Sequence, residues 1–515
     1  MIDEFGSLWD LIERRALETP DGPTAVDERG GSLTFAGLRE GAERVAAGLA
    51  ANHGIGEGDV VSWQLPTWTE SMVLVGALSR LQAVQNPILP LYRQREVGFI
   101  VPQARTKLFL TPSTWRGFDY EAMVREIAQS AGGVEVLVAD RTLPEGDPAS
   151  LPPRPSARGP DDAPVRWLFY TSGTTAEPKG AKHTDHTIAA AARGMVERLA
   201  LVPEDRSALV FPFTHVGGII WLYAGLMTGL VNVIDEAFDP EKTTEYLAKQ
   251  DVTLAGSGTF FHLAYLKMQQ ADPSRKLFPN VRAYPGGGAP KPPQLHYDLK
   301  EHLGGAGIVS GYGLTEAPII SMAGVDDTDE VLANTEGRAT PGVELRAVTL
   351  EGNEAGVGEE GEIRAKGPQL MRGYVDSSLD AEAFDEDGWF RTGDLGTLDG
   401  AGNVTITGRL KDIIIRKGEN ISAKELEDAL FTHPKVADVA VVGLPDPESG
   451  EIACAVVASK RPEDPLSFEE MQAFLEEQTV TKRKWPERLE SVEALPRNPA
   501  GKVLKQDLRK QFGDG

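Results

Sequence analysis

The chain has 515 residues, of which 41% are hydrophobic and 25% are charged, and its formal net charge is −25 at pH 7. This length exceeds what one hydrophobic core usually serves, so we expect at least two domains. The negative charge argues against binding to nucleic acid or to an anionic membrane, because both need a broad positive face. The single cysteine, Cys454, excludes an intrachain disulfide, fits a reducing compartment and lies in an apolar run typical of a core.

The N-terminus begins MIDEFGSLWD, with acidic residues ahead of any basic one, which does not suit a secretory signal. We therefore expect a cytoplasmic protein. Residues 215–234 contain no Asp, Glu, Lys or Arg over a length that could span a bilayer. Their four glycines, an internal Asn232 and the lack of basic flanks favour a buried helix of a globular protein over an integral membrane segment.

Short apolar runs alternate with a helical pattern in the first part of the chain. Residues 59–65 and 107–110 are short and apolar, whereas residues 69–83 show helical periodicity. This alternation predicts the parallel-sheet units of an α/β fold. Residues 143–164 contain seven prolines and indicate an extended surface connection.

The last third of the chain has short strand-like runs separated by glycine turns. A further compact α+β unit of about one hundred residues begins near Lys411. Each of its two predicted helices, 422–432 and 468–478, opens with a Ser-x-x-Glu capping box. The strand-like runs 437–442 and 452–459 lie between these helices.

A loop rich in hydroxyl and glycine residues separates an apolar stretch, 165–170, from a predicted helix, 186–200. It reads YTSGTTAEPKG over residues 170–180. A strand that ends in such a loop offers backbone N–H groups, hydroxyls and one ammonium, which suit a polyphosphate. The loop lacks the spacing of the two common phosphate loops, so composition alone leaves an ordinary flexible loop open.

Five further segments follow this loop in order. They are FPFTHVGG (211–218), GYGLTEA (311–317), FRTGDLG (390–396), GRLKDIIIRKGENIS (408–422) and LPRNPAGKVLK (495–505). Together with the loop, and over nearly the whole chain, they resemble the adenylate-forming superfamily of acyl-CoA synthetases, non-ribosomal peptide adenylation domains and luciferases. The resemblance implies a two-step reaction that uses ATP, Mg²⁺ and coenzyme A. A carboxylate attacks the α-phosphate of ATP to give an acyl adenylate and pyrophosphate, and a thiol then displaces AMP.

The resemblance also implies a multidomain fold of the α/β and α+β classes. A large N-terminal domain, 1–408, would combine α/β subdomains with a β-rich subdomain and hold ATP and the acyl group. A small mobile α+β domain, 409–515, would carry Lys502 and turn about a hinge at Lys411 between the two steps.

Three groups of residues match nucleotide contacts of the superfamily. The phosphate loop and its flanks correspond to Thr171, Ser172, Gly173, Thr174, Thr175 and Lys179. The segments on either side of adenine correspond to Gly288, Ala289, Pro290, Tyr312, Gly313 and Leu314. The ribose hydroxyls match Asp394, whose carboxylate can accept two hydrogen bonds, and Arg409. Ala176 stands where the family usually has glycine, a change that removes no phosphate donor.

Four residues match catalytic positions. The ammonium of Lys502 would offset the repulsion between the incoming carboxylate and the α-phosphate and would stabilise the transition state. Thr315 matches a donor to the α-phosphate, and Glu316 matches the carboxylate that holds Mg²⁺. His215 would lie between the acyl pocket and the nucleotide, with a structural core histidine as the alternative.

The acyl pocket matches His215, Val216, Gly217 and Gly287. Val216 stands where amino-acid-activating relatives usually carry Asp for the substrate ammonium, so an α-amino acid is a poor candidate. An apolar pocket instead suits a fatty, alicyclic, aromatic or terpenoid-like acid. Residues 86–100 look similar to segments of medium-chain and cyclohexanecarboxylate-type CoA ligases, which favours a cyclic or medium-length acid.

The CoA contacts that the resemblance implies are Gly418, which leaves room for the pantetheine arm, and the basic residues Arg416, Lys417, Lys482, Arg483 and Lys484. A solvated basic face is the alternative for these cations. Two other functions stay open, a stand-alone acid–AMP ligase that loads a carrier protein and a non-catalytic protein that binds nucleotide or acyl ligand. A homodimer is one of the open oligomeric states.

Overall fold

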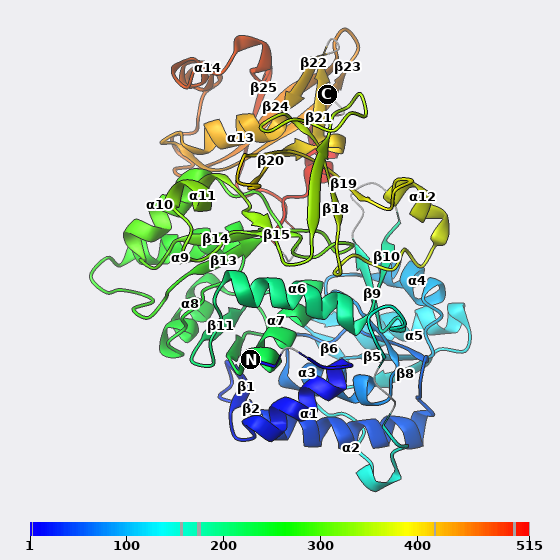
Figure 1. The fold of residues 1–515 in the computed structure, drawn as a ribbon. Coiled ribbons are helices and arrows are strands. Elements are labelled where there is room, and N and C mark those ends of the chain that lie inside the picture. Colours follow the sequence, from blue (N-terminus) through cyan, green and yellow to red (C-terminus); the bar gives the residue numbers. More distant parts are fainter. Residues whose placement is uncertain (3, 155–157, 172–176, 417–418, 498–500, 514–515) are drawn as a thin grey trace.

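The computed structural model describes residues 1–2, 4–154, 158–171, 177–416, 419–497 and 501–513. A large body holds the N-terminal and central parts of the chain, and a smaller domain formed by the C-terminal residues lies at one end of it (Figure 1). The fold is therefore of the expected mixed α/β class. None of the described helices is long and apolar enough to cross a membrane.

The first sheet of the large body has six strands in the order β10-β9-β4-β3-β5-β8. Five of them are parallel and β10 is antiparallel to β9. The strands are β3 (Val60–Trp63), β4 (Val84–Pro87), β5 (Leu108–Thr111), β8 (Glu135–Val138), β9 (Trp167–Thr171) and β10 (Lys179–His183), and a small hairpin, β6 (Thr114–Trp115) and β7 (Phe118–Asp119), follows β5. Its helices are α2 (Phe35–His53), α3 (Thr69–Arg80), α4 (Gln94–Gln103) and α5 (Tyr120–Ala131).

A second sheet has the order β11-β12-β1-β2, and a third has the order β13-β14-β15-β16. Their strands are β1 (Pro23–Asp27), β2 (Ser32–Thr34), β11 (Arg206–Leu209), β12 (Val231–Ile234), β13 (Tyr284–Gly287), β14 (Ile308–Tyr312), β15 (Ser321–Met322) and β16 (Arg338–Ala339). Their helices are α1 (Leu8–Glu18), α6 (Asp185–Arg198), α7 (Val216–Thr228), α8 (Pro240–Lys249), α9 (Thr259–Ala271), α10 (Pro293–His302) and α11 (Asp329–Asn334).

Residues 215–234 form two elements, where the sequence predicted one buried helix. Helix α7 ends at Thr228, Gly229 follows in the left-handed conformation, and the remaining apolar residues form the buried strand β12 between β11 and β1. The expectation of a helix is therefore wrong for the last residues of the segment. A short apolar run suits a buried strand as well as a helix, and the glycine break decides between them.

Helices α6 and α7 pack against each other in the core of the large body (Figure 1). The buried carboxylate of Asp185, at the start of α6, ties this core together. It accepts hydrogen bonds from the Trp167 indole at 2.9 Å, the Tyr223 hydroxyl at 2.9 Å and the Leu8 backbone N–H at 3.0 Å. A buried carboxylate is stable when several donors satisfy it, and these come from β9, α7 and α1.

An antiparallel sheet in the order β17-β18-β19-β20 connects the large body to the small domain. The elements of this region are β17 (Glu344–Val348), β18 (Gly361–Lys366), α12 (Asp380–Ala383), β19 (Phe390–Leu398) and β20 (Val404–Arg409). The elements of the small domain are β21 (Ile413–Arg416), β22 (Glu419–Ser422), α13 (Ala423–Phe431), β23 (Val436–Asp446), β24 (Gly450–Ser459), α14 (Phe468–Glu477), β25 (Arg488–Val492) and α15 (Lys505–Gly513). Ser467 and Glu470 form the predicted capping box of α14, and Ser422 caps α13.

Candidate active site

A cavity of about 1520 Å³ opens between the large body and the small domain. Its walls come from the carboxyl ends of β9, β13 and β14, the start of α7, strands β19 and β20, and the loop before α15. The predicted site residues that line it are Thr171, Lys179, His215, Val216, Gly217, Gly287, Gly288, Ala289, Pro290, Tyr312, Gly313, Leu314, Thr315, Glu316, Asp394, Arg409, Lys411, Lys484 and Lys502. Segments far apart in the sequence therefore meet at one place.

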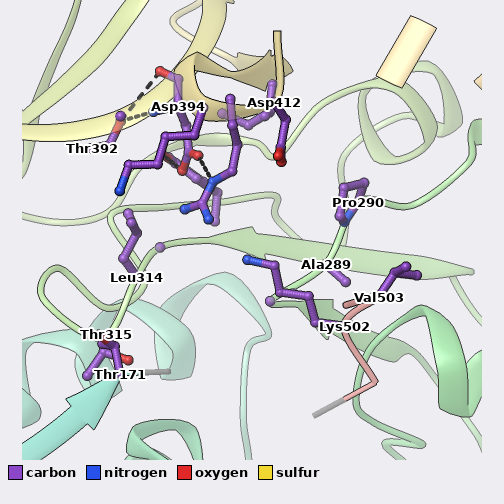
Figure 2. A pocket seen from close by; sticks show the side chains of 18 of the residues that line it. Thr171, Ala289, Pro290, Leu314, Thr315, Thr392, Asp394, Asp412, Lys502 and Val503 are labelled. Atoms are coloured by element: carbon purple, nitrogen blue, oxygen red, sulfur yellow. Dashed lines mark hydrogen bonds and ion pairs between the residues drawn. The ribbon is translucent and has the colours of Figure 1, made fainter. Parts of the chain in front are cut away.

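One corner of the cavity is built around the carboxylate of Asp394, which is 4% exposed. The Tyr312 hydroxyl donates to it at 2.8 Å, and Arg409 forms an ion pair with it from the paired position on β20. The Thr392 hydroxyl accepts a hydrogen bond from the Asp394 backbone N–H at 3.1 Å (Figure 2). Burial, and then the charge of Asp394, raise the pKa of Tyr312 well above its ordinary value, so the phenol stays a donor.

The turn that follows β14 presents Thr315 and Glu316 to the cavity, and it requires glycine at Gly313. A Cβ atom on Gly313 would lie 2.7 Å from the Ala317 carbonyl oxygen and closer still to the Ile319 nitrogen. Hydrogen bonds between the backbones of Leu314 and Ala317 close the turn. Thr315 and Glu316 therefore lie on a tight turn, and any side chain at position 313 would force that turn open.

His183, on β10, supports this turn from behind. Its Nε2 donates to the Thr315 carbonyl oxygen at 2.9 Å, and its Nδ1 lies 3.0 Å from the Thr187 hydroxyl. Burial lowers the pKa of His183 to about 4, so the ring is neutral and keeps both contacts near neutral pH. No local sequence pattern signals this role of His183, because it depends on a contact between distant segments.

The carboxylate of Glu316 accepts a hydrogen bond from the Tyr374 hydroxyl at 2.9 Å. The ammonium of Lys179 lies over the Tyr374 ring, 5.4 Å from its centroid. Mg²⁺ is commonly held by one or two carboxylates together with substrate phosphates. A cavity-lining carboxylate that is oriented by a neutral donor, beside a lysine, fits that arrangement. Tyr374 was not among the residues that the sequence predicted.

Lys502 extends from the small domain into the cavity, between the Asp394 corner and the segment that holds Ala289 (Figure 2). Burial, and then the positive charge of Arg409, lower its pKa to about 8, against the opposing charges of Asp394 and Asp412. Asp412 itself is held by Arg509 on α15 at 2.9 Å. The amine therefore lies among positively and negatively charged side chains. Because burial lowers its pKa, the amine can lose its proton at a pH only slightly above neutral.

His215 caps the N-terminus of α7, where its Nδ1 accepts the Gly217 backbone N–H at 3.1 Å. The ring of Phe211 packs edge-on against the imidazole, with the two ring centroids 6.1 Å apart. Burial lowers the pKa of His215 to about 4. His215 is thus neutral and serves both as a helix cap and as a wall of the cavity. Beside it the cavity is lined by the apolar side chains Met195, Val216, Ile220, Trp221, Ile319 and Met322.

Of the four predicted CoA residues that the structure describes, three lie away from the cavity. Arg416 forms an ion pair with Glu487 and donates to the Trp485 carbonyl at 3.1 Å. Lys482 pairs with Glu476 at 3.1 Å, and Lys484, which lines the cavity, pairs with Glu425 at 2.7 Å. The structure brings neither Arg416, Lys482 nor Arg483 to the cavity wall.

Six predicted residues, Ser172, Gly173, Thr174, Thr175, Lys417 and Gly418, lie outside the described residues.

Similarity to known proteins places the chain in a family. The family model of the AMP-binding enzyme matches residues 12–375, and that of the AMP-binding enzyme C-terminal domain matches residues 425–502. The chain is 33% identical over 522 residues to the medium-chain fatty-acid–CoA ligase of Escherichia coli (strain K12), covering 98% of this chain and 90% of that protein. It is 31% identical over 508 residues to the salicyl-AMP ligase / salicyl-S-ArCP synthetase of Mycobacterium tuberculosis (strain ATCC 25618 / H37Rv). This match covers 94% of this chain and 86% of that protein.

A solved structure agrees over the whole fold. ATP-bound MatB from Rhodopseudomonas palustris matches with a TM-score of 0.87 at 28% identity, covering 98% of this chain and 99% of that chain. The arrangement of a large N-terminal part and a small C-terminal domain is thus common to both proteins. The chain belongs to the AMP-binding enzyme family, within the adenylate-forming superfamily whose motifs it carries.

Proposed function

We propose that this protein is an acyl-CoA synthetase that activates a hydrophobic, non-amino carboxylic acid with ATP and Mg²⁺ and transfers the acyl group to CoA. One observation carries the proposal. The amine of Lys502 lies in the same cavity as the Asp394 corner, the Thr315–Glu316 turn, His215 and a group of apolar side chains, which is called the apolar branch below. A site with a diol acceptor, a metal-binding carboxylate, a cation and an apolar pocket is suited to joining an apolar acid to a nucleotide.

In the first step an oxygen of the substrate carboxylate forms a bond to the α-phosphorus of ATP, and the bond to the pyrophosphate oxygen breaks. Asp394 and Arg409 hold the ribose, and the Tyr312 ring lies against adenine. Lys502 neutralises charge between the two reacting anions, and the Thr315 hydroxyl donates to the α-phosphate. Glu316 would hold Mg²⁺, which would supply positive charge for the pyrophosphate as it leaves.

In the second step the CoA sulfur attacks the acyl carbon, and the bond to the AMP phosphate oxygen breaks. Lys502 fills part of the site in this structure, so we propose that the small domain turns about Lys411 to admit the thiol. The division into domains 1–408 and 409–515 is supported by the end of β20 at Arg409 and the start of a separate sheet at Ile413. Arg416, Lys482 and Arg483 lie outside the cavity, which fits residues that would act only in the second orientation.

The apolar branch of the cavity limits the acid. Its side chains Met195, Val216, Ile220, Trp221 and Met322 carry no charge. A substrate ammonium or second carboxylate would lose its hydration there without gaining a partner. A medium-length, alicyclic, aromatic or terpenoid-like acid therefore fits best.

A carrier protein is the second candidate acceptor, because the salicyl-AMP ligase / salicyl-S-ArCP synthetase is 31% identical to this chain. The test is a screen of ATP- and Mg²⁺-dependent pyrophosphate release over fatty, alicyclic, aromatic and amino acids, each with and without CoA. The proposal predicts release with apolar acids only, and an acyl-CoA product whenever CoA is present. Release without any CoA thioester would favour the carrier protein, and release with amino acids would contradict the assignment of the pocket.

A further inference from the structure

The described residues on either side of Lys502 are linked to the small domain. Arg497 and Val503 form an antiparallel bridge across its base. The Arg497 guanidinium donates to the Gly501 carbonyl oxygen and forms an ion pair with Asp438, on β23, at 2.6 Å. The residue next to Lys502 is therefore anchored to the small domain by a charge-assisted link.

Gly501, the residue before Lys502, contacts the large body at Phe260, near the start of α9. Gly501 has a φ of +81°, and a Cβ atom built on it would lie 2.7 Å from the Phe260 Cβ and 3.4 Å from its Cγ. The backbone of Gly501 therefore packs directly on Phe260, at a separation that only glycine allows. Lys502 enters the cavity immediately after this contact.

Phe260 is well placed to serve as a fixed support. The rings of Phe238 and Phe261 meet it edge-on, with centroids 5.7 Å and 5.2 Å away. The preceding residue, Thr259, donates its hydroxyl to the Pro290 carbonyl oxygen at 2.8 Å, which ties the start of α9 to the predicted adenine segment. Phe260 is nevertheless 37% exposed, whereas its neighbour Phe261 is 1% exposed, so core packing does not account for it.

We propose that Phe260 is a positioning residue for adenylation, on which Gly501 rests so that Lys502 enters the cavity at the correct depth. The inference rests on the proposed two-step function. An apolar contact suits an interface that must form and separate in each cycle, because separation leaves no buried charge or hydrogen bond unpaired. Since Lys502 serves only the first step, the loss of Phe260 should affect that step alone.

The test compares the two half-reactions in Phe260→Ala, Phe260→Leu and a control, Gln270→Ala, on an exposed position of the same helix. A misplacement of about 1 Å can cost about 100-fold in rate, so Phe260→Ala should lower the kcat of pyrophosphate release by about 10- to 100-fold. The KM for ATP should stay unchanged. Thioester formation from a supplied acyl adenylate and CoA should also stay unchanged. Phe260→Leu should recover most of the rate, and Gln270→Ala should match the wild type.

A double-mutant cycle tests the contact itself. Gly501→Ala should slow adenylation because its methyl group meets Phe260, and the strain of its positive φ is the same with or without Phe260. That methyl group would lie 2.7 Å from the Phe260 Cβ, which alanine retains, so the cycle uses Phe260→Gly, in which this Cβ is absent and the added loss from Gly501→Ala should be smaller. Unchanged adenylation in Phe260→Ala, equal loss of both half-reactions, or additive effects in the cycle would overturn the inference. Absence of pyrophosphate release from the wild type with every acid would instead contradict the proposed function.

Discussion

Lys502 has a charge that depends on its surroundings in the cavity. Burial and Arg409 lower its pKa to about 8, and the proposed role requires the protonated amine. The protonated fraction falls as the pH rises through the pKa, so kcat/KM for adenylation should decline about tenfold per pH unit above pH 8. His215, with a pKa of about 4, is neutral throughout and adds no change between pH 6 and 9.

The control for this pH profile is Lys502→Arg, because a guanidinium stays protonated over the whole range. Its activity, although lower, should show no decline near pH 8. A wild-type rate that rises between pH 8 and 10, or the same decline in the arginine variant, would show that another group titrates.

Tyr374 orients the carboxylate that is proposed to hold Mg²⁺. Tyr374→Phe removes the hydroxyl that donates to Glu316 at 2.9 Å and keeps the ring beneath Lys179. Partners of metal ligands typically contribute about 10- to 100-fold to metal affinity, so half-maximal pyrophosphate release should need about tenfold more Mg²⁺. The matched control is Tyr246→Phe, whose hydroxyl bonds to the distant Val26 carbonyl. An unchanged Mg²⁺ dependence in Tyr374→Phe would disprove this role.

At the scale of elements, the turn after β14 is the most constrained part of the site. Gly313→Ala places a methyl group against the Ala317 carbonyl and the Ile319 nitrogen, so the turn must open and displace Thr315 and Glu316. We expect a loss of unfolding free energy of about 1–3 kcal/mol and at least a tenfold slower adenylation. Thermal unfolding and pyrophosphate release measure the two effects.

The control for this glycine is Gly98, in the interior of α4, where an added Cβ would meet nothing within 4 Å. Gly98→Ala should raise the unfolding free energy by about 0.5–1 kcal/mol, because alanine loses less conformational freedom in a helix. Equal stability of the Gly313 and Gly98 variants would contradict the steric argument.

The sequence predicted the parts of the site that lie within contiguous motifs. The segments that carry Tyr312, Asp394 and Lys502 were recognisable by their residue types and order, and the structure brings them to one cavity. His183 and Tyr374 were missed because each acts through one contact with a residue more than fifty positions away in the sequence. No local pattern reports such a contact.

The fold was predictable to a similar extent. The helix cap at Ser467 and the short apolar strands of the first sheet depend on local sequence patterns. The structure confirms the predicted cap and the predicted strands. The strand β12 was missed because an uncharged apolar run is compatible with either a helix or a buried strand. Strands β11 and β1, on either side of β12, come from other parts of the chain. Pairing with both of them makes this segment a strand instead of a helix.

For the whole molecule, the small domain places Lys502 in the cavity, which is the orientation proposed for the first step. We expect Lys502→Ala to abolish pyrophosphate release, because the reacting anions then face each other without a cation. The variant should still form acyl-CoA from a supplied acyl adenylate, since the proposal gives Lys502 no part in that step. Equal loss of both half-reactions would show that the small domain does not alternate as proposed.

The most direct test of the central claim is to follow one turnover of the wild-type protein with its preferred acid by mass spectrometry. The two-step reaction should yield an acyl adenylate and pyrophosphate when CoA is absent, and stoichiometric conversion to acyl-CoA and AMP when CoA is added. Formation of ADP in place of AMP and pyrophosphate, or of acyl-CoA without a detectable acyl adenylate, would contradict the account.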